Sequence, residues 1–302
     1  MIRLGTRGSA LALAQAHWVA ERLPGDVEIV PITTSGDQPS RGQTPLGGLG
    51  VEVADKSRFV KEIEEALLRG DVDLAVHSAK DVPAELPDGL AIVGVPQRAD
   101  PRDALCGAGT LDDLREGAIV GTASVRRRAA LLALRQDLDV RDLRGNVDTR
   151  LRRLAEGDFD AIVLAQAGLE RLGRADEGSP LDPATFIPAA GQGCLALEAR
   201  AEHPHAAEAA SHLSEPAAVA ALTAERALVH KLGATCHTPV GAHTVADGGG
   251  MRLTAFVGLP DGSRWIRDEL DGDPGDPPAL GTAVAERLLV AGAAELLGAA
   301  PG

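Results

Sequence analysis

The sequence predicts an α/β protein built from two similar lobes, followed by a small α+β domain. Strand-like and helix-like segments alternate from residue 1 to about residue 95 and again from residue 117 to residue 168, which is typical of parallel sheets covered by helices. From about residue 216 the order changes to helix, strand, strand, helix. A length of 302 residues agrees with two or three domains.

The first unit begins with a short strand and a helix, for which Ser9 is suited as the N-cap. Its regular elements are expected at 1–6 (strand), 9–23 (helix), 27–32 (strand), 59–70 (helix ending at Gly70) and 73–78 (buried strand). Residues 35–57 are rich in glycine, polar and charged residues and predict a long loop. Loops of that length are more often functional than accidental.

The second unit repeats the alternation, and the third part departs from it. The second unit is expected to contain a strand at 117–124, a helix at 125–135, a strand at 139–143, a helix at 147–157 capped by Asn146, and a strand at 160–168. The third part is expected to contain a helix at 217–232, strands at 252–259 and 263–270, and a helix at 282–297. No internal repeat changes this organisation.

Composition limits the classes of function. The formal net charge of -14 argues against non-specific nucleic-acid binding, which needs a basic face. No run of about 18 apolar residues predicts a membrane span, and the N-terminal stretch does not resemble a secretion signal. Cys106, Cys194 and Cys236 are too few and too scattered for a disulfide framework or a zinc site. We therefore expect a reduced cytoplasmic protein without a bound metal.

Arginines are concentrated in one region of this acidic chain. Residues 126–174 hold 11 of them, whereas the whole chain has four lysines. Genomic composition explains a general preference for arginine over lysine, but it does not explain the clustering. The arginines that follow predicted strand ends are Arg126, Arg127, Arg144, Arg150 and Arg171. Ligands of open α/β sheets bind at those ends, and arginine forks bind carboxylates or phosphates, so the pattern predicts a site for several acidic groups.

Two further stretches carry candidate binding groups. In HSAKDVP, Ser78, Lys80 and Asp81 follow a buried strand. Lys80 is suited to an anion, and Asp81 either exchanges a proton with a substrate or shapes the turn before Val-Pro. In TRGSALAL, Arg7 and Ser9 stand at a strand-to-helix junction that is again suited to an anion.

A third candidate lies in the segment LGATCHTPVGAH. Cys236 stands there among glycine, threonine and proline, which predicts an exposed thiol that is available as a nucleophile. His237 is adjacent, but neighbouring residues seldom have the geometry of a Cys–His catalytic pair.

Taken together, these motifs resemble the porphobilinogen deaminase (hydroxymethylbilane synthase) family. The matching blocks, in order, are TRGSALAL, TPLGG, FVKEIE, DLAVHSAKDVP, DPRDA, GTASVRR, LRGNVDTRL, DAIVLAQAGLERLG, PAAGQG, TAER and CHTPVG. The resemblance implies a cytoplasmic, monomeric transferase of tetrapyrrole (haem) biosynthesis that condenses four porphobilinogen units with loss of ammonia. It also implies two lobes like those of periplasmic binding proteins, and a dipyrromethane cofactor attached covalently to a cysteine. Each porphobilinogen adds two carboxylates, which agrees with the arginine cluster.

The resemblance also implies roles for individual residues. Asp81 corresponds to the catalytic carboxylate and Cys236 to the thioether attachment point. The implied cofactor-binding residues are Ser78, Lys80, Asp81, Thr122, Ser124, Arg126, Arg127 and Gly145. The implied substrate-binding residues are Arg7, Ser9, Arg144, Arg150 and Arg171. Lys56 and Phe59 correspond to the lid of the family.

The sequence departs from the family pattern in three places. Ala234 and Thr235 precede the cysteine where the family usually has two glycines, and both disfavour positive φ. The lid reads GGLGVEVADKSRF where the family usually has GGKGLF. Cys194 is a second thiol near the hinge and is expected to be a buried small residue.

The expected domain bounds are residues 1–96 with 194–214 for the first lobe, 97–193 for the second lobe and 215–302 for the C-terminal domain. Two alternatives remain open from the residues alone. A two-lobed anion-binding protein without activity has similar arginines but needs neither Asp81 nor Cys236. A nucleic-acid-binding protein that uses the basic run at 126–153 conflicts with the acidic total and the 2% of aromatic residues.

Overall fold

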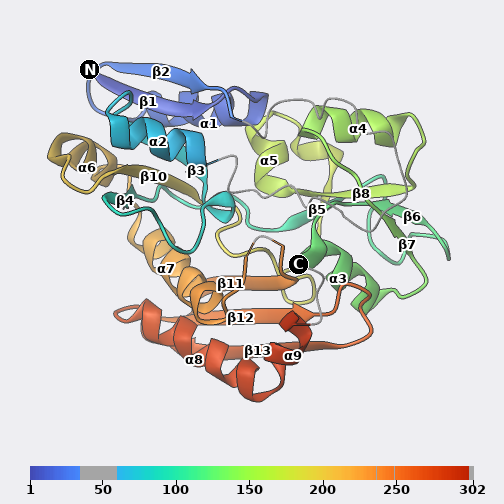
Figure 1. The fold of residues 1–302 in the computed structure, drawn as a ribbon. Coiled ribbons are helices and arrows are strands. Elements are labelled where there is room, and N and C mark those ends of the chain that lie inside the picture. The colour runs from blue at the N-terminus through green and yellow to red at the C-terminus, as the bar shows by residue number, and fades with distance from the viewer. Residues whose placement is uncertain (35–59, 236, 248, 299–302) are drawn as a thin grey trace.

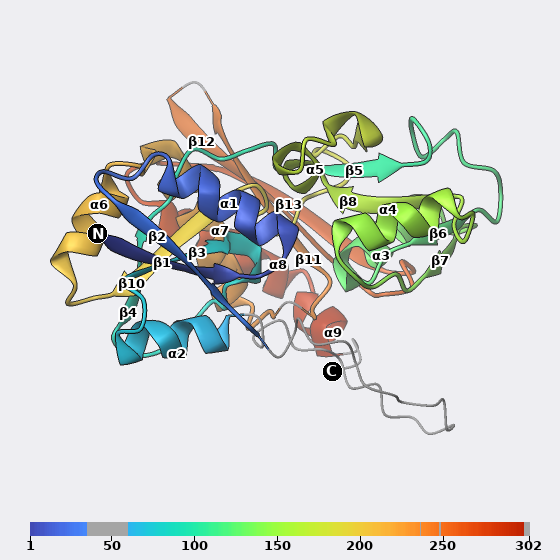
Figure 2. The same cartoon turned by 90° about the horizontal axis from the view of Figure 1, so that it is seen from above.

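A computed structural model describes residues 1–34, 60–235, 237–247 and 249–298 of the chain. In these ranges the strands form three sheets, and helices pack against each of them. Figures 1 and 2 show the first and second sheets side by side, and Figure 1 shows the third below them. This arrangement confirms the predicted class of two α/β lobes and a small α+β domain. None of the helices in the described ranges combines the length and apolar character that a membrane span needs.

The first sheet has the strand order β2-β1-β3-β10-β4. Its strands are β1 (Ile2–Arg7), β2 (Val27–Ile32), β3 (Leu74–Ser78), β4 (Leu90–Gly94) and β10 (Leu195–Arg200). The helices packed against it are α1 (Ala10–Ala20), α2 (Lys61–Arg69) and α6 (Pro204–Ser211). The predicted caps are confirmed, because the Ser9 hydroxyl accepts a hydrogen bond from the Ala12 amide at 3.3 Å and Gly70 ends α2 with a φ of 76°.

The second sheet has the strand order β7-β6-β8-β5-β9. Its strands are β5 (Asp103–Cys106), β6 (Ile119–Gly121), β7 (Asp139–Arg141), β8 (Ala161–Ala165) and β9 (Ser179–Pro180). Its helices are α3 (Val125–Leu134), α4 (Val147–Ala155) and α5 (Gln166–Arg171). Asn146 caps α4 as predicted, since its side-chain oxygen accepts a hydrogen bond from the Thr149 amide at 2.9 Å.

The third sheet has the order β11-β12-β13, with β11 (Val240–Asp247), β12 (Gly250–Gly258) and β13 (Trp265–Gly272). Two long helices, α7 (Pro216–Lys231) and α8 (Pro277–Val290), lie side by side against it, and α9 (Ala293–Gly298) follows (Figure 1). Leu228, Leu253 and Val284 belong to the core that joins helices and sheet.

The structure corrects four expectations. Both lobes have mixed rather than parallel sheets, because β10 runs antiparallel to β3 and β4, and β5 runs antiparallel to β8 and β9. The expected strand at 160–168 ends at Ala165, and the next residues start α5. The third domain has an additional strand, β11. The expected helix at 282–297 is two helices, interrupted at Gly292 where φ is 101°.

One buried carboxylate on α7 joins the third sheet to the segments that connect the two lobes. Glu225 is fully buried and accepts hydrogen bonds from the Arg98 guanidinium at 2.7 and 3.2 Å, the Gly191 amide at 2.6 Å and the Thr244 amide at 2.8 Å. A buried carboxylate is stable only when such partners replace its hydration. Glu225 therefore fixes α7 to β11 and to both chain segments, near residues 98 and 191, that connect the two lobes.

Candidate active site

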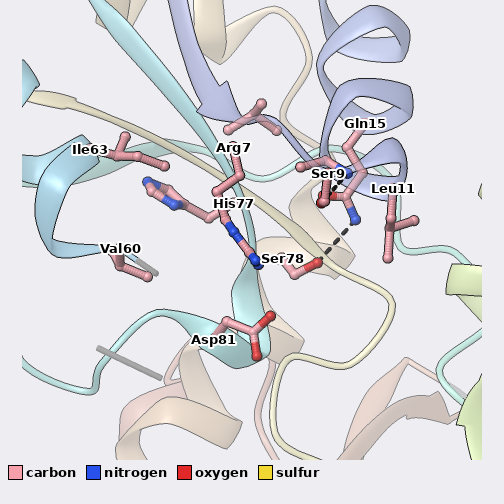
Figure 3. A pocket seen from close by; sticks show the side chains of 11 residues that line it. Arg7, Ser9, Leu11, Gln15, Val60, Ile63, His77, Ser78 and Asp81 are labelled. Atoms are coloured by element: carbon pink, nitrogen blue, oxygen red, sulfur yellow. Dashed lines mark hydrogen bonds between the residues drawn. The ribbon is translucent and has the colours of Figure 1, made fainter. Parts of the chain in front are cut away.

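The ends of β1 and β3 bring the first group of predicted residues together. The two strands are parallel neighbours, so their carboxyl ends lie at the same edge of the sheet. Arg7 ends β1, Ser78 ends β3, and Asp81 closes the 3-10 turn Ala79–Asp81 that follows β3. These side chains line a cavity of about 70 Å³ together with Ser9 (Figure 3). The Ser78 hydroxyl accepts a hydrogen bond from the Gln15 amide nitrogen at 3.0 Å.

Lys80 connects this edge with the second lobe through a residue that sequence reasoning missed. Its Nζ donates a hydrogen bond to Oε1 of Gln192 at 3.1 Å. The Gln192 side chain in turn donates to the Pro101 carbonyl at 2.7 Å and to Oδ1 of Asp103 at 3.1 Å. Gln192 is 1% exposed, so burial and these three bonds fix its amide. It lies in the matching block PAAGQG, but nothing in that pattern assigned it a role.

Arg126 and Arg127 both bind Asp103, which is fully buried at the start of β5. The distances from the carboxylate oxygens are 2.8 Å to Nη1 of Arg126, and 2.8 Å to both Nε and Nη2 of Arg127. Both guanidiniums also donate to backbone carbonyls, Arg126 to Ile187 and Arg127 to Val163. Burial alone would raise the pKa of Asp103, but the two arginines lower it to about 2.

Two cations against one carboxylate leave this buried cluster with a net positive charge. Nε of Arg126 is buried without a hydrogen-bond partner. The neighbouring α3 is capped by Ser124, whose hydroxyl accepts from the Arg127 amide at 3.4 Å and whose amide donates to the Thr122 hydroxyl at 3.1 Å. An unsatisfied donor and excess positive charge beside a helix N-terminus fit an acidic group bound nearby.

The remaining predicted arginines lie in three different settings. Arg150 is half-buried and donates through Nε to the Gly145 carbonyl at 2.7 Å. Its pKa is lowered to about 10, first by burial and then by repulsion from Arg127, while attraction to Asp81 opposes the shift. Arg150 of the second lobe therefore lies within electrostatic range of Asp81 in the first lobe.

Arg171 and Arg144 differ in exposure. Arg171 is half-buried in the last turn of α5 and donates to the Gly193 carbonyl at 2.7 Å. Burial lowers its pKa. The Arg144 side chain is 54% exposed and lies 3.8 Å from Asp142. Gly145, next to Arg144, has a φ of 112°, a conformation that favours glycine.

Cys194 is confirmed as a buried residue. It is 1% exposed, and burial raises its pKa to about 12. A thiol with that pKa stays protonated at neutral pH and is a poor nucleophile. Cys236, Lys56 and Phe59 lie outside the described residues. Within the described ranges no group of three or more histidine, cysteine, aspartate or glutamate residues is arranged to hold a metal ion.

Known proteins resemble the chain over nearly its whole length. A family model described as "Porphobilinogen deaminase, dipyromethane cofactor binding domain" matches residues 2–208, and one described as "Porphobilinogen deaminase, C-terminal domain" matches residues 219–290. A porphobilinogen deaminase from Brevibacillus brevis is 45% identical over 98% of this chain and 96% of its own length. Porphobilinogen deaminases from Roseiflexus castenholzii and Thermus thermophilus are each 48% identical over 98% of both sequences. Among solved structures, a periplasmic substrate-binding protein of an ABC transporter from Coxiella burnetii superimposes with a TM-score of 0.42 and 16% identity, covering 72% of this chain and 94% of that one.

Proposed function

This chain belongs to the porphobilinogen deaminase family, and we propose that Asp81 is its catalytic carboxylate. The reaction is the condensation of four porphobilinogen units, head to tail, into hydroxymethylbilane with release of ammonia. It is a transferase reaction of tetrapyrrole biosynthesis and uses a dipyrromethane cofactor.

The observation that carries the proposal is the place of Asp81 at the meeting point of the two lobes. It lies in the cavity with Arg7 and Ser9 of the first lobe, and the adjacent Lys80 donates a hydrogen bond to Gln192 of the second lobe at 3.1 Å. Positive charge develops on a pyrrole ring when the amine of porphobilinogen leaves. A carboxylate that faces the ring nitrogen stabilises that charge and can accept or return a proton.

We propose that the residues that bind the cofactor lie near the place where the two lobes are connected. The dipyrromethane supplies the first acceptor ring for the growing chain. We assign its covalent attachment to the thiolate of Cys236, because a thiolate is the nucleophilic form of cysteine and the thiols of Cys106 and Cys194 are buried. The residues proposed to hold its acidic groups are Ser78, Lys80, Thr122, Ser124, Arg126, Arg127 and Gly145. The unsatisfied Nε of Arg126 supports this assignment.

The residues that we propose for substrate binding are four arginines that are less buried than Arg126 and Arg127, together with Ser9. Every added ring brings two carboxylates, and guanidinium groups bind carboxylates through paired hydrogen bonds. The residues proposed for these contacts are Arg7, Ser9, Arg144, Arg150 and Arg171. Arg150 and Arg171 donate to backbone carbonyls and Arg144 lies 3.8 Å from the exposed Asp142, whereas Arg126 and Arg127 both bind the fully buried Asp103.

Domain bounds, oligomeric state and location belong to the same proposal. We place the domains at 1–96 with 194–214, 97–193 and 215–302, and each of the three sheets is made of strands from one of these parts. We further propose a monomer in the cytoplasm that binds porphobilinogen. Buried free thiols at Cys106 and Cys194 support a reducing compartment.

The test is substitution of Asp81. Asp81→Ala is expected to lower turnover by about 10²–10⁴-fold, the range of general acid–base catalysis. Intact mass should still include the dipyrromethane, and this extra mass should be absent in Cys236→Ser. Asp88→Ala, an exposed position in the following loop, is the matched control and should keep normal turnover. Near-normal turnover of Asp81→Ala would remove Asp81 from the mechanism.

A further inference from the structure

The backbone that follows Asp81 is held by an arginine of the third domain. Arg226 lies on α7, and its Nη1 donates a hydrogen bond to the Val82 carbonyl at 3.3 Å. Its Nη2 donates to the carbonyls of Pro83 at 2.8 Å and Ala84 at 2.9 Å. One guanidinium therefore contacts three consecutive carbonyls, beginning at the residue directly after the 3-10 turn that carries Asp81.

This contact suits arginine because the guanidinium is a rigid, planar group of donors without an acceptor. Several carbonyls converging on it fix both the position and the orientation of the loop. Pro83 has no backbone N–H, so its carbonyl is its only backbone hydrogen-bonding group. The turn itself is closed by the Val82 amide, which donates to the Ala79 carbonyl at 3.2 Å. Arg226 thus supplements one local hydrogen bond with three long-range ones.

A second contact comes from the next turn of the same helix. His230 lies four residues after Arg226, and its Nε2 is 3.2 Å from Oε1 of Glu85. Residues four apart share one face of a helix, so this face of α7 follows the loop from 82 to 85. Glu225, adjacent to Arg226, binds the amide of Gly191 and the guanidinium of Arg98. Helix α7 is therefore fixed to the Asp81 loop and to the connection between the lobes at the same point.

We propose that Arg226 is a positioning residue for the reaction, which holds Asp81 at a fixed place relative to the C-terminal domain. This inference depends on the catalytic role proposed for Asp81. Helix α7 ends at Lys231, five residues before Cys236 in the sequence. The same helix thus connects the loop of the proposed catalytic carboxylate with the segment of the proposed attachment cysteine. A small displacement of a reacting group costs a large factor in rate, even when binding is unchanged.

A groove gives access to Arg226 and makes a chemical test possible. It has a volume of about 390 Å³ and is lined by Val93 and Val95 near the edge of the first sheet, by Leu222 and Thr223 of α7, and by Arg226. Shortening Arg226 to alanine adds space that is open to this groove. A free guanidinium ion is then able to reach the three carbonyls.

The experiment compares Arg226→Met, Arg226→Lys and Arg226→Ala with Arg200→Met. Arg200 is the matched control, because it also donates to backbone carbonyls of the first lobe, those of Leu67 and Val72, but these lie outside the Asp81 loop. For Arg226→Met we expect a kcat about 10–100-fold lower, a KM for porphobilinogen within about threefold, and a retained cofactor mass. Arg226→Lys should recover part of kcat, and guanidinium chloride at low concentration should raise the kcat of Arg226→Ala. Arg200→Met should keep kcat even if it unfolds at lower denaturant concentration.

The results distinguish this inference from the role of Asp81. Suppose that Asp81→Ala is inactive but the kcat of Arg226→Met is within twofold of the wild-type value. That result overturns only the positioning role of Arg226. A kcat loss that is equal in Arg226→Met and Arg200→Met, without guanidinium rescue, also overturns it. If Arg226→Met does not fold, Arg226→Lys and the rescue of Arg226→Ala decide the question. Near-normal turnover of Asp81→Ala instead overturns the proposed catalytic residue.

Discussion

Two buried carboxylates, one in each lobe, have neighbours of opposite sign: Asp103 lies beside cations, and Glu64 lies beside another carboxylate. Asp103 of the second lobe lies between two guanidiniums, and its pKa is lowered to about 2 although burial acts against this. Glu64 of the first lobe, on α2, is 8% exposed, and the charged groups that act on its pKa are Glu198 and His77. Its pKa is raised to about 7, first by burial and then by the negative charge of Glu198, while His77 opposes the shift.

The difference shows what the arginine cluster contributes to this acidic chain. Burial removes hydration from either carboxylate, and nearby cations or hydrogen-bond donors are needed to keep it charged. Asp103 keeps its charge and organises Arg126, Arg127 and Gln192 beside the candidate site. Glu64 accepts a proton near neutral pH, and its Oε1 is buried without a hydrogen-bond partner. Arg126 and Arg127 therefore neutralise the buried Asp103, in addition to the cofactor role that we propose for them.

Among the substitutions that test this comparison, we expect Asp103→Asn to have the largest effect. The substitution leaves two buried guanidiniums without their counter-charge, and removing one partner from a buried ion pair costs about 3–5 kcal/mol. We expect a loss of that size in the free energy of unfolding, measured with urea. Asp148→Asn, which removes an exposed partner of Arg174, is the control and should cost less than about 1 kcal/mol. Similar small losses in both variants would contradict the role given to Asp103.

The same carboxylate predicts a pH dependence at the acidic end. A group with a lowered pKa contributes stability above its unfolded pKa, near 4, and loses it as the pH falls through its folded pKa. With a folded pKa of about 2, Asp103 should account for a loss of about 2 kcal/mol between pH 4 and pH 2. Urea unfolding across this range should show a smaller loss in Asp103→Asn than in the unchanged protein. Equal slopes would mean that other carboxylates carry the effect.

Glu64→Gln tests the other side of the comparison. A group with a raised pKa contributes stability that is complete below its unfolded pKa, near 4.5, and is lost as the pH rises to its folded pKa of about 7. Glutamine does not ionise, so Glu64→Gln should be more stable than the unchanged protein at pH 8 by about 1–3 kcal/mol and similar at pH 4.5. Glu65→Gln, at the exposed neighbouring position, should show no such crossover. Lower stability of Glu64→Gln at pH 8 would refute the assignment.

The smallest expected effect separates the two causes of the Glu64 shift. Glu198→Gln removes the neighbouring charge, which is the second cause, but leaves burial, which is the first. The pKa of Glu64 should therefore fall only part of the way toward its ordinary value. The measurement is carboxyl-carbon NMR of Glu64 across a pH titration. A return to the ordinary pKa would show that charge repulsion, and not burial, dominates.

Local features of the fold were predictable from the sequence. The side chains of Ser9 and Asn146 accept hydrogen bonds from amides three residues later, and Gly70 ends its helix through its own conformation. Such interactions depend on neighbouring residues, so a short window of sequence contains the information. The mixed sheets were not predictable in the same way, because β10 pairs with β3 across more than a hundred residues. Strand β11 was missed since Gly241, His243 and Thr244 interrupt its apolar pattern.

The same distinction applies to the candidate site, where the sequence identified the groups but not their partners. By itself the sequence determined which groups are present: the clustered arginines, the Ser78, Lys80 and Asp81 stretch after a strand, and the motifs that identify the family. Only the tertiary structure decided how they are used, with Arg126 and Arg127 bound to Asp103, Lys80 linked through Gln192, and the loop after Asp81 held by Arg226. The physical reason is that charge and hydrogen-bonding capacity belong to a residue type, whereas burial and partners depend on segments that are distant in the chain.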